Sequence, residues 1–151
     1  MRGLEFLYTS NCKNILYELF RNIEINDYEW YIDEYEIIKE ENEQCKNMHF
    51  SSHLKEDEFL KLIHEPSCLI ISVNIQAYPS HKTKKHVVTY EDFQNSDCEL
   101  MLLITDVKYV EVYAKSKSVI MNIIENAENC GCSEITIKTD KEDGRTRLSV
   151  M

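Results

Sequence analysis

Three segments of the chain repeat apolar residues at the spacing of an amphipathic helix. Between residues 11 and 23 the apolar positions recur at i, i+3, i+4, i+7 and i+8, which places them in one stripe. A similar stripe is found in 116–131, where Gly131 stands at the position of a left-handed C-terminal cap. Acidic residues open a shorter segment at 56–66 and Pro66 closes it, as is typical of a helix. The pattern therefore predicts three helices.

Segments of alternating or β-branched residues predict strands between these helices. They are residues 3–8, 28–38, 68–78, 98–115, 133–138 and 146–150. The segment 98–115 is too long for one strand, so we expect a hairpin with its turn at 105–108. In 28–38 the apolar residues change face midway, which favours a bulge or a turn near Asp33–Glu34. The polar residues 39–47 are interpreted as a connection.

Residues 139–145, TDKEDGR, combine acids with a glycine and raise the question of a metal loop. In an EF-hand loop Gly144 would take position 6, and positions 1 and 3 would then be Thr139 and Lys141, which fail as carboxylate ligands. A phosphate-binding loop needs further glycines that this segment lacks. Asp-Gly between two alternating segments is instead typical of a hairpin turn, with Lys138 and other flanking cations balancing the acids.

These elements predict an α+β fold, because helices separate hairpins instead of alternating strictly with single strands. We expect a single domain over 1–151, with a largely antiparallel mixed sheet of about seven strands and three helices packed mainly on one face. The chain has 151 residues, 43% of them apolar, with 3 glycines and 2 prolines. This composition allows a buried core and short loops without disulfide staples.

The formal net charge is −10, and the acidic excess is concentrated in one segment. Residues 24–43 contain 9 acidic residues and 1 lysine, a local net charge of −8. Such a surface disfavours nucleic acid and acidic membranes as partners, and it suits a basic protein or a cation. Residues 79–88 are the basic exception. We expect them to form an exposed loop, followed by a capped helical turn at Thr89–Asp92.

The N-terminal segment has neither the long apolar run nor the small-residue cleavage site of a signal peptide. No stretch has the ~20 consecutive apolar residues that span a bilayer. The chain contains 6 cysteines, which without an export signal are typical of reduced thiols. We therefore expect a cytoplasmic protein.

Two groups of side chains have spacings that suggest chemistry. Cys45, His49 and His53 are four residues apart, which would suit zinc on a helix, but their surroundings predict a loop and no fourth ligand is evident. Cys130 and Cys132 lie at a helix C-terminus, where a thiolate is disfavoured, and one residue separates them where redox motifs have two. We interpret the first group as surface polar residues and the second as one packing cysteine and one turn cysteine, and we predict no metal and no cofactor.

Aromatic and acidic residues interleave at the start of segment 28–38. Tyrosine and tryptophan dominate interface hot spots, and surrounding acids would attract a basic partner. The residues of this predicted partner-binding surface are Tyr28, Trp30, Tyr31, Asp33, Glu34 and Tyr35. The alternative is that the aromatic side chains pack inside and the acids form a solvated face.

The function that these features favour is a non-catalytic protein-interaction module, with an inhibitor- or immunity-like role as one version by analogy. No local signature of a catalytic nucleophile, such as Gly-x-Ser-x-Gly, is present, so we predict no catalytic residues. The rival prediction is a small-molecule-binding protein or an enzyme whose site is assembled from distant segments. A homo-oligomer with a structural role is a third alternative.

The block VEVYAKSKSVIMNIIENAENCGCSEITIKTDKEDGRTRLSV (110–150), with MRGLEF at the start and YEWYI at 28–32, carries a family resemblance. With these segments the chain resembles, over its whole length, a family of small uncharacterised proteins from Bacillus-type bacteria, known as a domain of unknown function. The resemblance implies a single cytoplasmic α+β domain of bacterial origin. It transfers neither an activity nor a catalytic residue.

Overall fold

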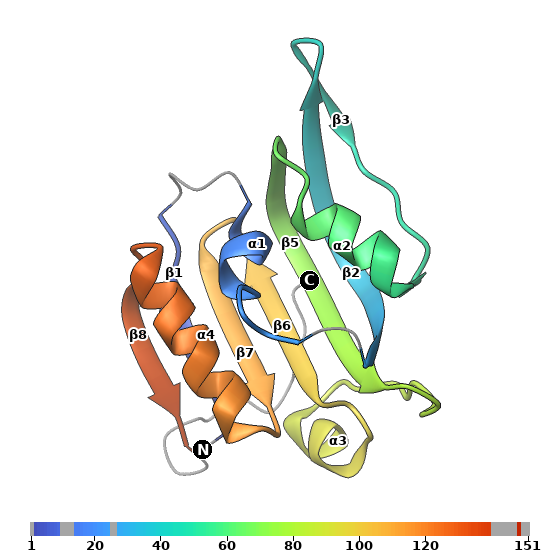
Figure 1. Ribbon diagram of the computed structural model, residues 1–151, viewed down its shortest axis with the longest axis vertical. Coiled ribbons are helices and arrows are strands. Elements are labelled where there is room, and N and C mark those ends of the chain that lie inside the picture. Colours follow the sequence, from blue (N-terminus) through green and yellow to red (C-terminus); the bar gives the residue numbers. More distant parts are fainter. Residues whose placement is uncertain (1, 10–13, 25–26, 140–147, 149–151) are drawn as a thin grey trace.

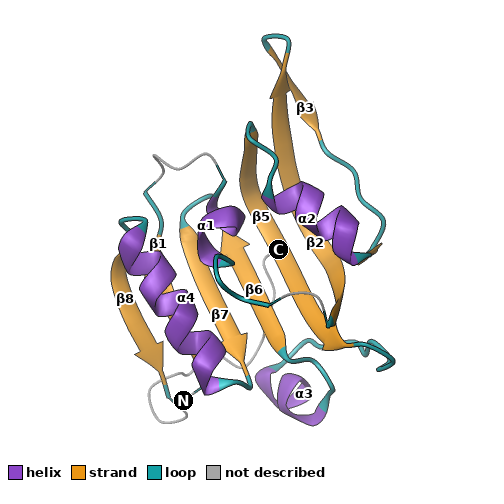
Figure 2. Cartoon of the chain, viewed as in Figure 1, coloured by secondary structure: helices purple, strands orange, loops and turns teal. Residues whose placement is uncertain are grey.

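The computed structural model describes residues 2–9, 14–24, 27–139 and 148, which form eight strands and four helices. In chain order these are β1 (Gly3–Leu7), α1 (Ile15–Leu19), β2 (Tyr28–Glu41), β3 (Gln44–Asn47), β4 (His53–Leu54), α2 (Glu56–Ile63), β5 (Cys68–Pro79), α3 (Tyr90–Asn95), β6 (Leu100–Thr105), β7 (Tyr109–Ala114), α4 (Lys117–Asn129) and β8 (Ser133–Lys138). The predicted α+β class is confirmed (Figure 2).

All of these strands belong to one antiparallel sheet. Its order is β3-β2-β5-β6-β7-β1-β8, and the short β4 also pairs with β2. The hairpin predicted in 98–115 is confirmed as β6 and β7, with Asp106 and Val107 in its turn. Helices α1, α2 and α4 lie in front of the sheet in Figure 1, and α3 lies beyond its lower end. We call the side with these three helices the helix face and the opposite side the open face.

Apolar side chains at alternate strand positions fill the space between the sheet and its helices. In β5 these are Val73, Ile75 and Ala77, all fully buried. Trp30 of β2 is 1% exposed and stacks on Phe59 of α2, with ring centroids 3.8 Å apart. Full burial of a large apolar side chain contributes roughly 1.5–3 kcal/mol. This stacked pair is therefore a main contributor to the stability of the helix face.

The open face carries a second, smaller apolar cluster. Its buried residues are Tyr78, Val87, Phe93, Cys98, Met101, Leu103, Tyr113 and Leu148. Val87 precedes α3 and Phe93 lies in it, so this part of the chain packs over the open face. The backbone N–H of Leu148 donates to the carbonyl of Val88 at 2.6 Å, which ties Leu148 to the same segment. The hairpin turn predicted after Thr139 lies outside the described residues.

Helix α1 is shorter than the apolar stripe of 11–23 predicts. Asn14 caps its start, and the helix ends at Leu19. Asn126 of α4 donates to the carbonyls of Leu19 at 2.9 Å and of Arg21 at 2.7 Å. A neighbouring helix thus satisfies carbonyls that further turns of α1 would have bonded. The prediction that the helix continues to residue 23 is wrong for this reason.

Strand β2 contains the irregularity that its sequence predicts. Its register with β5 shifts between Ile32 and Tyr35, so Asp33 and Glu34 together face the single residue Asn74. This arrangement is a β-bulge. It allows the residues on both sides of the bulge to pack against the core of the helix face.

The connection predicted at 39–47 is instead a hairpin. Strand β2 continues to Glu41, and the chain turns through Asn42 and Glu43 into β3. The turn residues have φ of 52° and 64°, as a type I′ turn requires. We call the two paired strand ends and this turn, residues 38–47, the arm. The arm projects beyond the rest of the sheet in Figure 1.

Candidate functional site

The predicted partner-binding segment contributes more to the core than to the surface. Trp30 is 1% exposed, so its ring is buried in the core and does not offer a contact to a partner. Tyr28 is half-buried, with its ring centroid 6.0 Å from that of Trp30. The hydroxyl of Tyr35 accepts the backbone N–H of Phe50 at 2.8 Å, and the two rings pack edge to face. The aromatic side chains are thus largely internal, as the alternative interpretation of this segment expects.

Tyr31 lies on the opposite side of β2 from Trp30 and is half-buried. Its ring stacks on His53 of β4, with centroids 4.7 Å apart. His53 Nε2 lies 2.5 Å from Glu29 Oε2, and Lys84 Nζ lies 5.8 Å from the centre of the tyrosine ring. Burial, and then the Glu29 carboxylate, raise the pKa of Tyr31. The result is a small surface patch in which an aromatic ring is flanked by the His53–Glu29 contact and an ammonium group.

The bulge in β2 brings the acidic strand against the basic loop that follows β5. Lys84 Nζ lies 3.1 Å from Asp33 Oδ2, and Gln76 Nε2 donates to the same oxygen at 2.8 Å. These residues border a hollow of about 340 Å³. Its lining consists of Asp33, Glu34, Asn74, Lys84, His86, Val87, Val88 and Leu148. The predicted residues Asp33 and Glu34 therefore share a hollow with Lys84 and His86 instead of forming a purely acidic surface.

Polar side chains continue from this hollow into the buried centre of the open face. Gln76 is fully buried on β5, and Asn74 is 3% exposed. The hydroxyl of Tyr78 lies 3.0 Å from Gln76 Oε1 and 3.1 Å from the carbonyl of Lys85. Burial is the main cause that raises the pKa of Tyr78 far above its usual value, so the hydroxyl stays protonated. Among the described residues no buried side-chain nitrogen or oxygen lacks a partner, so this network holds the loop against the sheet.

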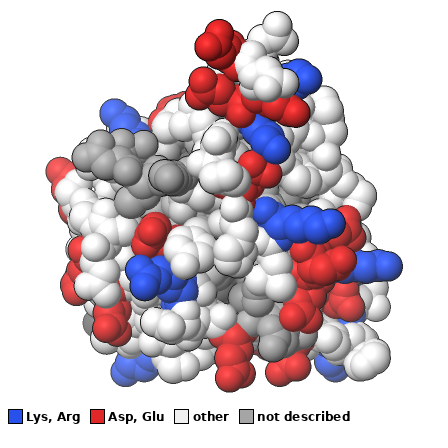
Figure 3. Space-filling view, turned by 45° about the horizontal axis from the view of Figure 1, so that its top comes forward, with Lys and Arg blue, Asp and Glu red and all other residues white. Residues whose placement is uncertain are grey.

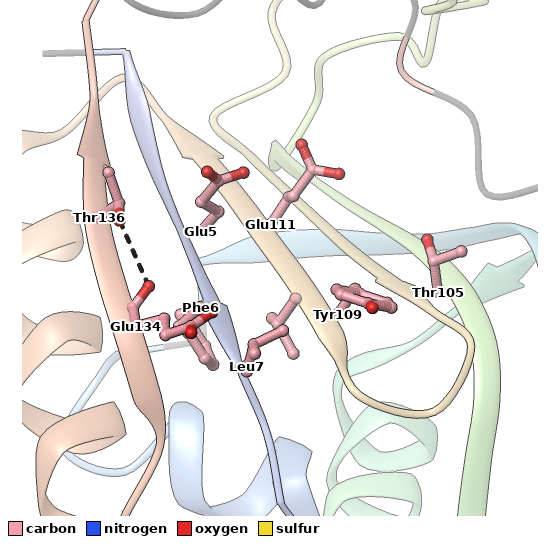
Figure 4. Close-up of a pocket in the computed structure, with 9 residues that line it drawn as sticks. Glu5, Phe6, Leu7, Thr105, Tyr109, Glu111, Glu134 and Thr136 are labelled. Atoms are coloured by element: carbon pink, nitrogen blue, oxygen red, sulfur yellow. Dashed lines mark hydrogen bonds between the residues drawn. The ribbon is translucent and has the colours of Figure 1, made fainter.

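A larger hollow of about 470 Å³ lies on the open face over β1, β7 and β8 (Figure 4). It is lined by Glu5, Phe6, Leu7, Thr105, Tyr109, Val110, Glu111, Glu134 and Thr136. Glu5 and Glu111 are cross-strand neighbours and project to the same side. The buried Lys138 lies close to both, with Nζ 2.7 Å from Glu111 Oε2 and 3.3 Å from Glu5 Oε2. This hollow combines carboxylates with the exposed ring of Tyr109.

The arm is the most exposed part of the acidic segment. Glu40, Glu41 and Glu43 are all exposed, and acidic side chains gather at the top of Figure 3, where the arm ends. Lys39 is directed to Glu65, with Nζ 3.3 Å from Oε1. Strand β3 lies at the edge of the sheet, and in the described part of the chain it pairs with β2 alone. Three exposed glutamates against Lys39 and the exposed Lys46 leave the arm with a net charge of −1, beside an open strand edge.

Comparison with known proteins places this fold in a family. A family model described as protein of unknown function (DUF2691) matches residues 1–149. The chain belongs to this family. The uncharacterized protein YncE of Bacillus subtilis (strain 168) is 31% identical over 151 residues, with 99% of each chain covered. No solved structure matches. The family resemblance carried by residues 110–150 is thereby confirmed.

Neither the DUF2691 description nor the relative's name states an activity, so the family assigns no functional residue. Among the described residues, no group of three His, Cys, Asp or Glu side chains is placed to hold a metal ion. Cys45 lies on β3 and His53 on β4, with His49 in the extended segment between them. A spacing of four residues brings side chains together on a helix but not along an extended chain. None of the helices in the described ranges has the length and apolarity needed to cross a membrane.

Two polar residues that organise the open face of this DUF2691 protein were not among the sequence-based candidates. Gln76 lies in segment 68–78, where polar and apolar residues alternate. That alternation indicates that one face of this strand carries polar side chains, and it could have identified Gln76. Lys138 was expected to balance the acids of the following turn. The structure instead pairs Lys138 with Glu111 and Glu5, which belong to strands far from it in the sequence.

Proposed function

We propose that this protein is a non-catalytic protein-interaction module of the cytoplasm, and that the arm binds an extended basic segment of its partner. The observation that carries the proposal is an open strand edge beside exposed carboxylates, in a chain of net charge −10. An inhibitor- or immunity-like role would be one form of this function. Cys45, Cys68 and Cys98 are unbridged, which supports the cytoplasmic part of the proposal.

The outer edge of β3 has backbone groups that a partner strand would use. The N–H of Met48 donates to the carbonyl of Ile37. Backbone groups alternate in direction along a strand, so those of Lys46 and Gln44 also point toward β2. Cys45 and Asn47 therefore direct their N–H and C=O groups outward. An extended peptide that adds to a sheet edge draws its affinity from such main-chain hydrogen bonds.

The arm contains three glutamates against Lys39 and Lys46, and this excess of negative charge favours a basic peptide over other extended segments. Glu40 of β2 lies opposite Cys45 of β3, and Glu43 lies in the turn that joins these two strands. Exposed carboxylates at these positions would speed the encounter with a positively charged strand and orient it. Because exposed ion pairs contribute roughly 0.2–1 kcal/mol each, binding is expected to weaken as salt is raised.

The test is a titration of the full-length protein with a synthetic peptide of alternating lysine and valine, followed by amide NMR. We expect shifts and slower hydrogen exchange at the amides of Cys45 and Asn47. The double variant Glu40→Lys/Glu43→Lys should bind about tenfold more weakly, the equivalent of ~1.4 kcal/mol. The matched control is Glu125→Lys/Glu128→Lys, which reverses two exposed charges on α4.

Three results would count against the interaction proposal. One is a set of shifts spread evenly over the acidic surface without protection at β3, which would mean unspecific charge attraction. Another is equal weakening by the control pair on α4. The third is equal binding of a peptide in which aspartate replaces lysine, because the proposed surface selects a basic strand.

A second candidate function is binding of a small organic cation in the hollow of about 470 Å³. Its volume lies within the usual range of small-molecule sites, and the exposed ring of Tyr109 with the carboxylate of Glu5 fits a cationic ligand. Titration with 1,4-diaminobutane should shift the amides around Glu5 and Tyr109, and Tyr109→Ala should reduce the affinity. No shift at millimolar diamine would eliminate this candidate.

A further inference from the structure

The end of helix α4 brings two cysteine sulfurs into contact. Cys130 is the C-cap, Gly131 follows with a φ of +81°, and Cys132 comes next. The N–H of Gly131 donates to the carbonyl of Glu128 at 3.2 Å, and that of Cys132 to the carbonyl of Ala127 at 3.0 Å. These two bonds form a Schellman motif, which reverses the chain direction tightly. As a result the Sγ atoms of Cys130 and Cys132 lie 3.5 Å apart.

We propose that Cys130 and Cys132 form a reversible dithiol–disulfide couple in the folded protein. The sulfurs are 3.5 Å apart, and a disulfide requires about 2.05 Å, so closure needs a displacement of about 1.5 Å shared between two side chains. Small rotations about the Cα–Cβ bonds supply such a displacement. Both side chains are half-buried, so a small oxidant in solvent has access to them.

The other described cysteines differ from this pair in their surroundings. Cys68 and Cys98 are buried, and burial raises the pKa of their thiols to about 11 and about 12, respectively. A protonated, buried thiol reacts slowly with disulfides. Cys45 is exposed on the arm and serves as an internal comparison for simple accessibility. The proposed couple depends on the turn after α4 and is independent of the function proposed for the arm.

The oxidant is a low-molecular-weight disulfide, RSSR, and the reaction is thiol–disulfide exchange. One cysteine loses its proton, and its sulfur attacks RSSR. An S–S bond to the protein forms, the S–S bond of RSSR breaks, and RS⁻ leaves to be protonated. The second cysteine then loses its proton, and its sulfur attacks the Sγ of the first cysteine. The intramolecular S–S bond forms, the bond between that Sγ and the R sulfur breaks, and RS⁻ leaves to be protonated as the second RSH. The dithiol is oxidised by two electrons, and RSSR is reduced to two RSH.

The experiment uses the reduced full-length protein, equilibrated with glutathione at a series of oxidised-to-reduced ratios. After acid quenching, thiols are alkylated in denaturant and the protein is digested with trypsin. Cleavage after Lys117 and Lys138 releases a peptide, 118–138, that contains Cys130 and Cys132 and no other cysteine. A disulfide within this peptide is recognised because the peptide takes up no alkyl group and has lost two hydrogen atoms.

We expect the disulfide to form in the folded protein at about a tenfold lower ratio of oxidised to reduced glutathione than in the isolated 118–138 peptide, because the fold holds the two sulfurs together. Cys132→Ser should instead retain one glutathione on Cys130. Cys45→Ser should behave as the wild type. Circular dichroism of each variant confirms that it is folded.

Other outcomes of the digest would overturn the proposal. These are two alkyl groups on the peptide at every ratio, one glutathione on each cysteine, or a disulfide that joins this peptide to another one. Closure at the same ratio in the folded protein and in the isolated peptide would also overturn it, since the fold would then contribute nothing.

Discussion

Asn126 is the residue whose replacement tests most directly how α1 is held. It is 9% exposed on α4, and its side-chain amide donates to the carbonyls of Leu19 at 2.9 Å and of Arg21 at 2.7 Å. Helix α1 has only 5 residues, so it depends on such contacts and not on its intrinsic propensity. In Asn126→Ala the fully buried Leu19 loses the donor to its carbonyl, which costs roughly 1–3 kcal/mol. The exposed Arg21 can bond water instead, and the loss there is about 0.5–1 kcal/mol.

Alanine has a higher helix propensity than asparagine, which offsets about 0.5 kcal/mol of this loss. The free energy of unfolding of Asn126→Ala should therefore fall by about 1–3.5 kcal/mol. Urea unfolding followed by far-UV circular dichroism measures it as a lower midpoint at unchanged slope. The matched control is Asn122→Ala, an exposed position on the same helix, which should be neutral or slightly stabilising. If the two variants unfold at the same urea concentration, the bonds from Asn126 do not hold α1 and our reasoning fails.

Three further predictions use the same unfolding assay. A Cβ at Gly3 would lie 2.1 Å from the backbone oxygen of Val112, so Gly3→Ala must push β1 away from β7 and should cost about 1–3 kcal/mol; wild-type stability would contradict this contact. A Cβ at Gly131 meets nothing within 4 Å, so Gly131→Ala should cost about 1 kcal/mol through its φ of +81° alone, and a larger loss would point to a steric effect that we do not expect. Burial raises the pKa of Cys98 from 9.0 to about 12 and that of Cys68 to about 11. The two buried thiols therefore contribute their full stabilisation below pH 9, where they are protonated in both states. This stabilisation is lost as pH rises from 9 through the pKa values of the folded state, because the thiols of the unfolded chain ionise first. The loss of stability between pH 8 and 11 should be smaller in Cys98→Ser than in the wild type, and an equal loss would refute the assignment.

The elements that the sequence predicted well are those whose sequence pattern is local. The stripe in 116–131 and its cap at Gly131 led to α4, which the structure bounds at Lys117–Asn129. The change of apolar face in β2 indicated the bulge at Asp33–Glu34, because a strand must change face where one extra residue is inserted. Such patterns can be recognised because helices and strands repeat every 3.6 and 2 residues.

The arm was not predicted because its turn lacks the residue that usually marks one. Type I′ turns favour glycine at a central position, and here Asn42 and Glu43 adopt the positive φ angles. Asparagine tolerates this conformation, whereas glutamate rarely adopts it. The pairing of β2 with β3 holds the turn in place, and that pairing is a property of the assembled sheet.

The candidate surfaces likewise combine charged segments that the sequence indicates with contacts that only the fold creates. The acidic segment 24–43 and the basic loop 79–88 were both evident in the sequence, but their contact through Asp33 and Lys84 was not. Alternation along β2 assigns Trp30 and Tyr31 to opposite faces without indicating which face helices will cover. Only the position of α2, with Phe59 against Trp30, assigned the tryptophan to the core.

The sequence by itself determined the α+β class, the main helix at the C-terminal side and the alternating faces of the strands, because the apolar periods of helices and strands depend on residues close in the chain. The tertiary structure decided where α1 stops, which aromatic side chains are buried and which charges meet. Those outcomes depend on contacts between distant residues, such as the bond from Asn126 to Leu19 across 107 positions. A side chain's burial is set by whatever packs over it, and one strand's pattern does not contain that information.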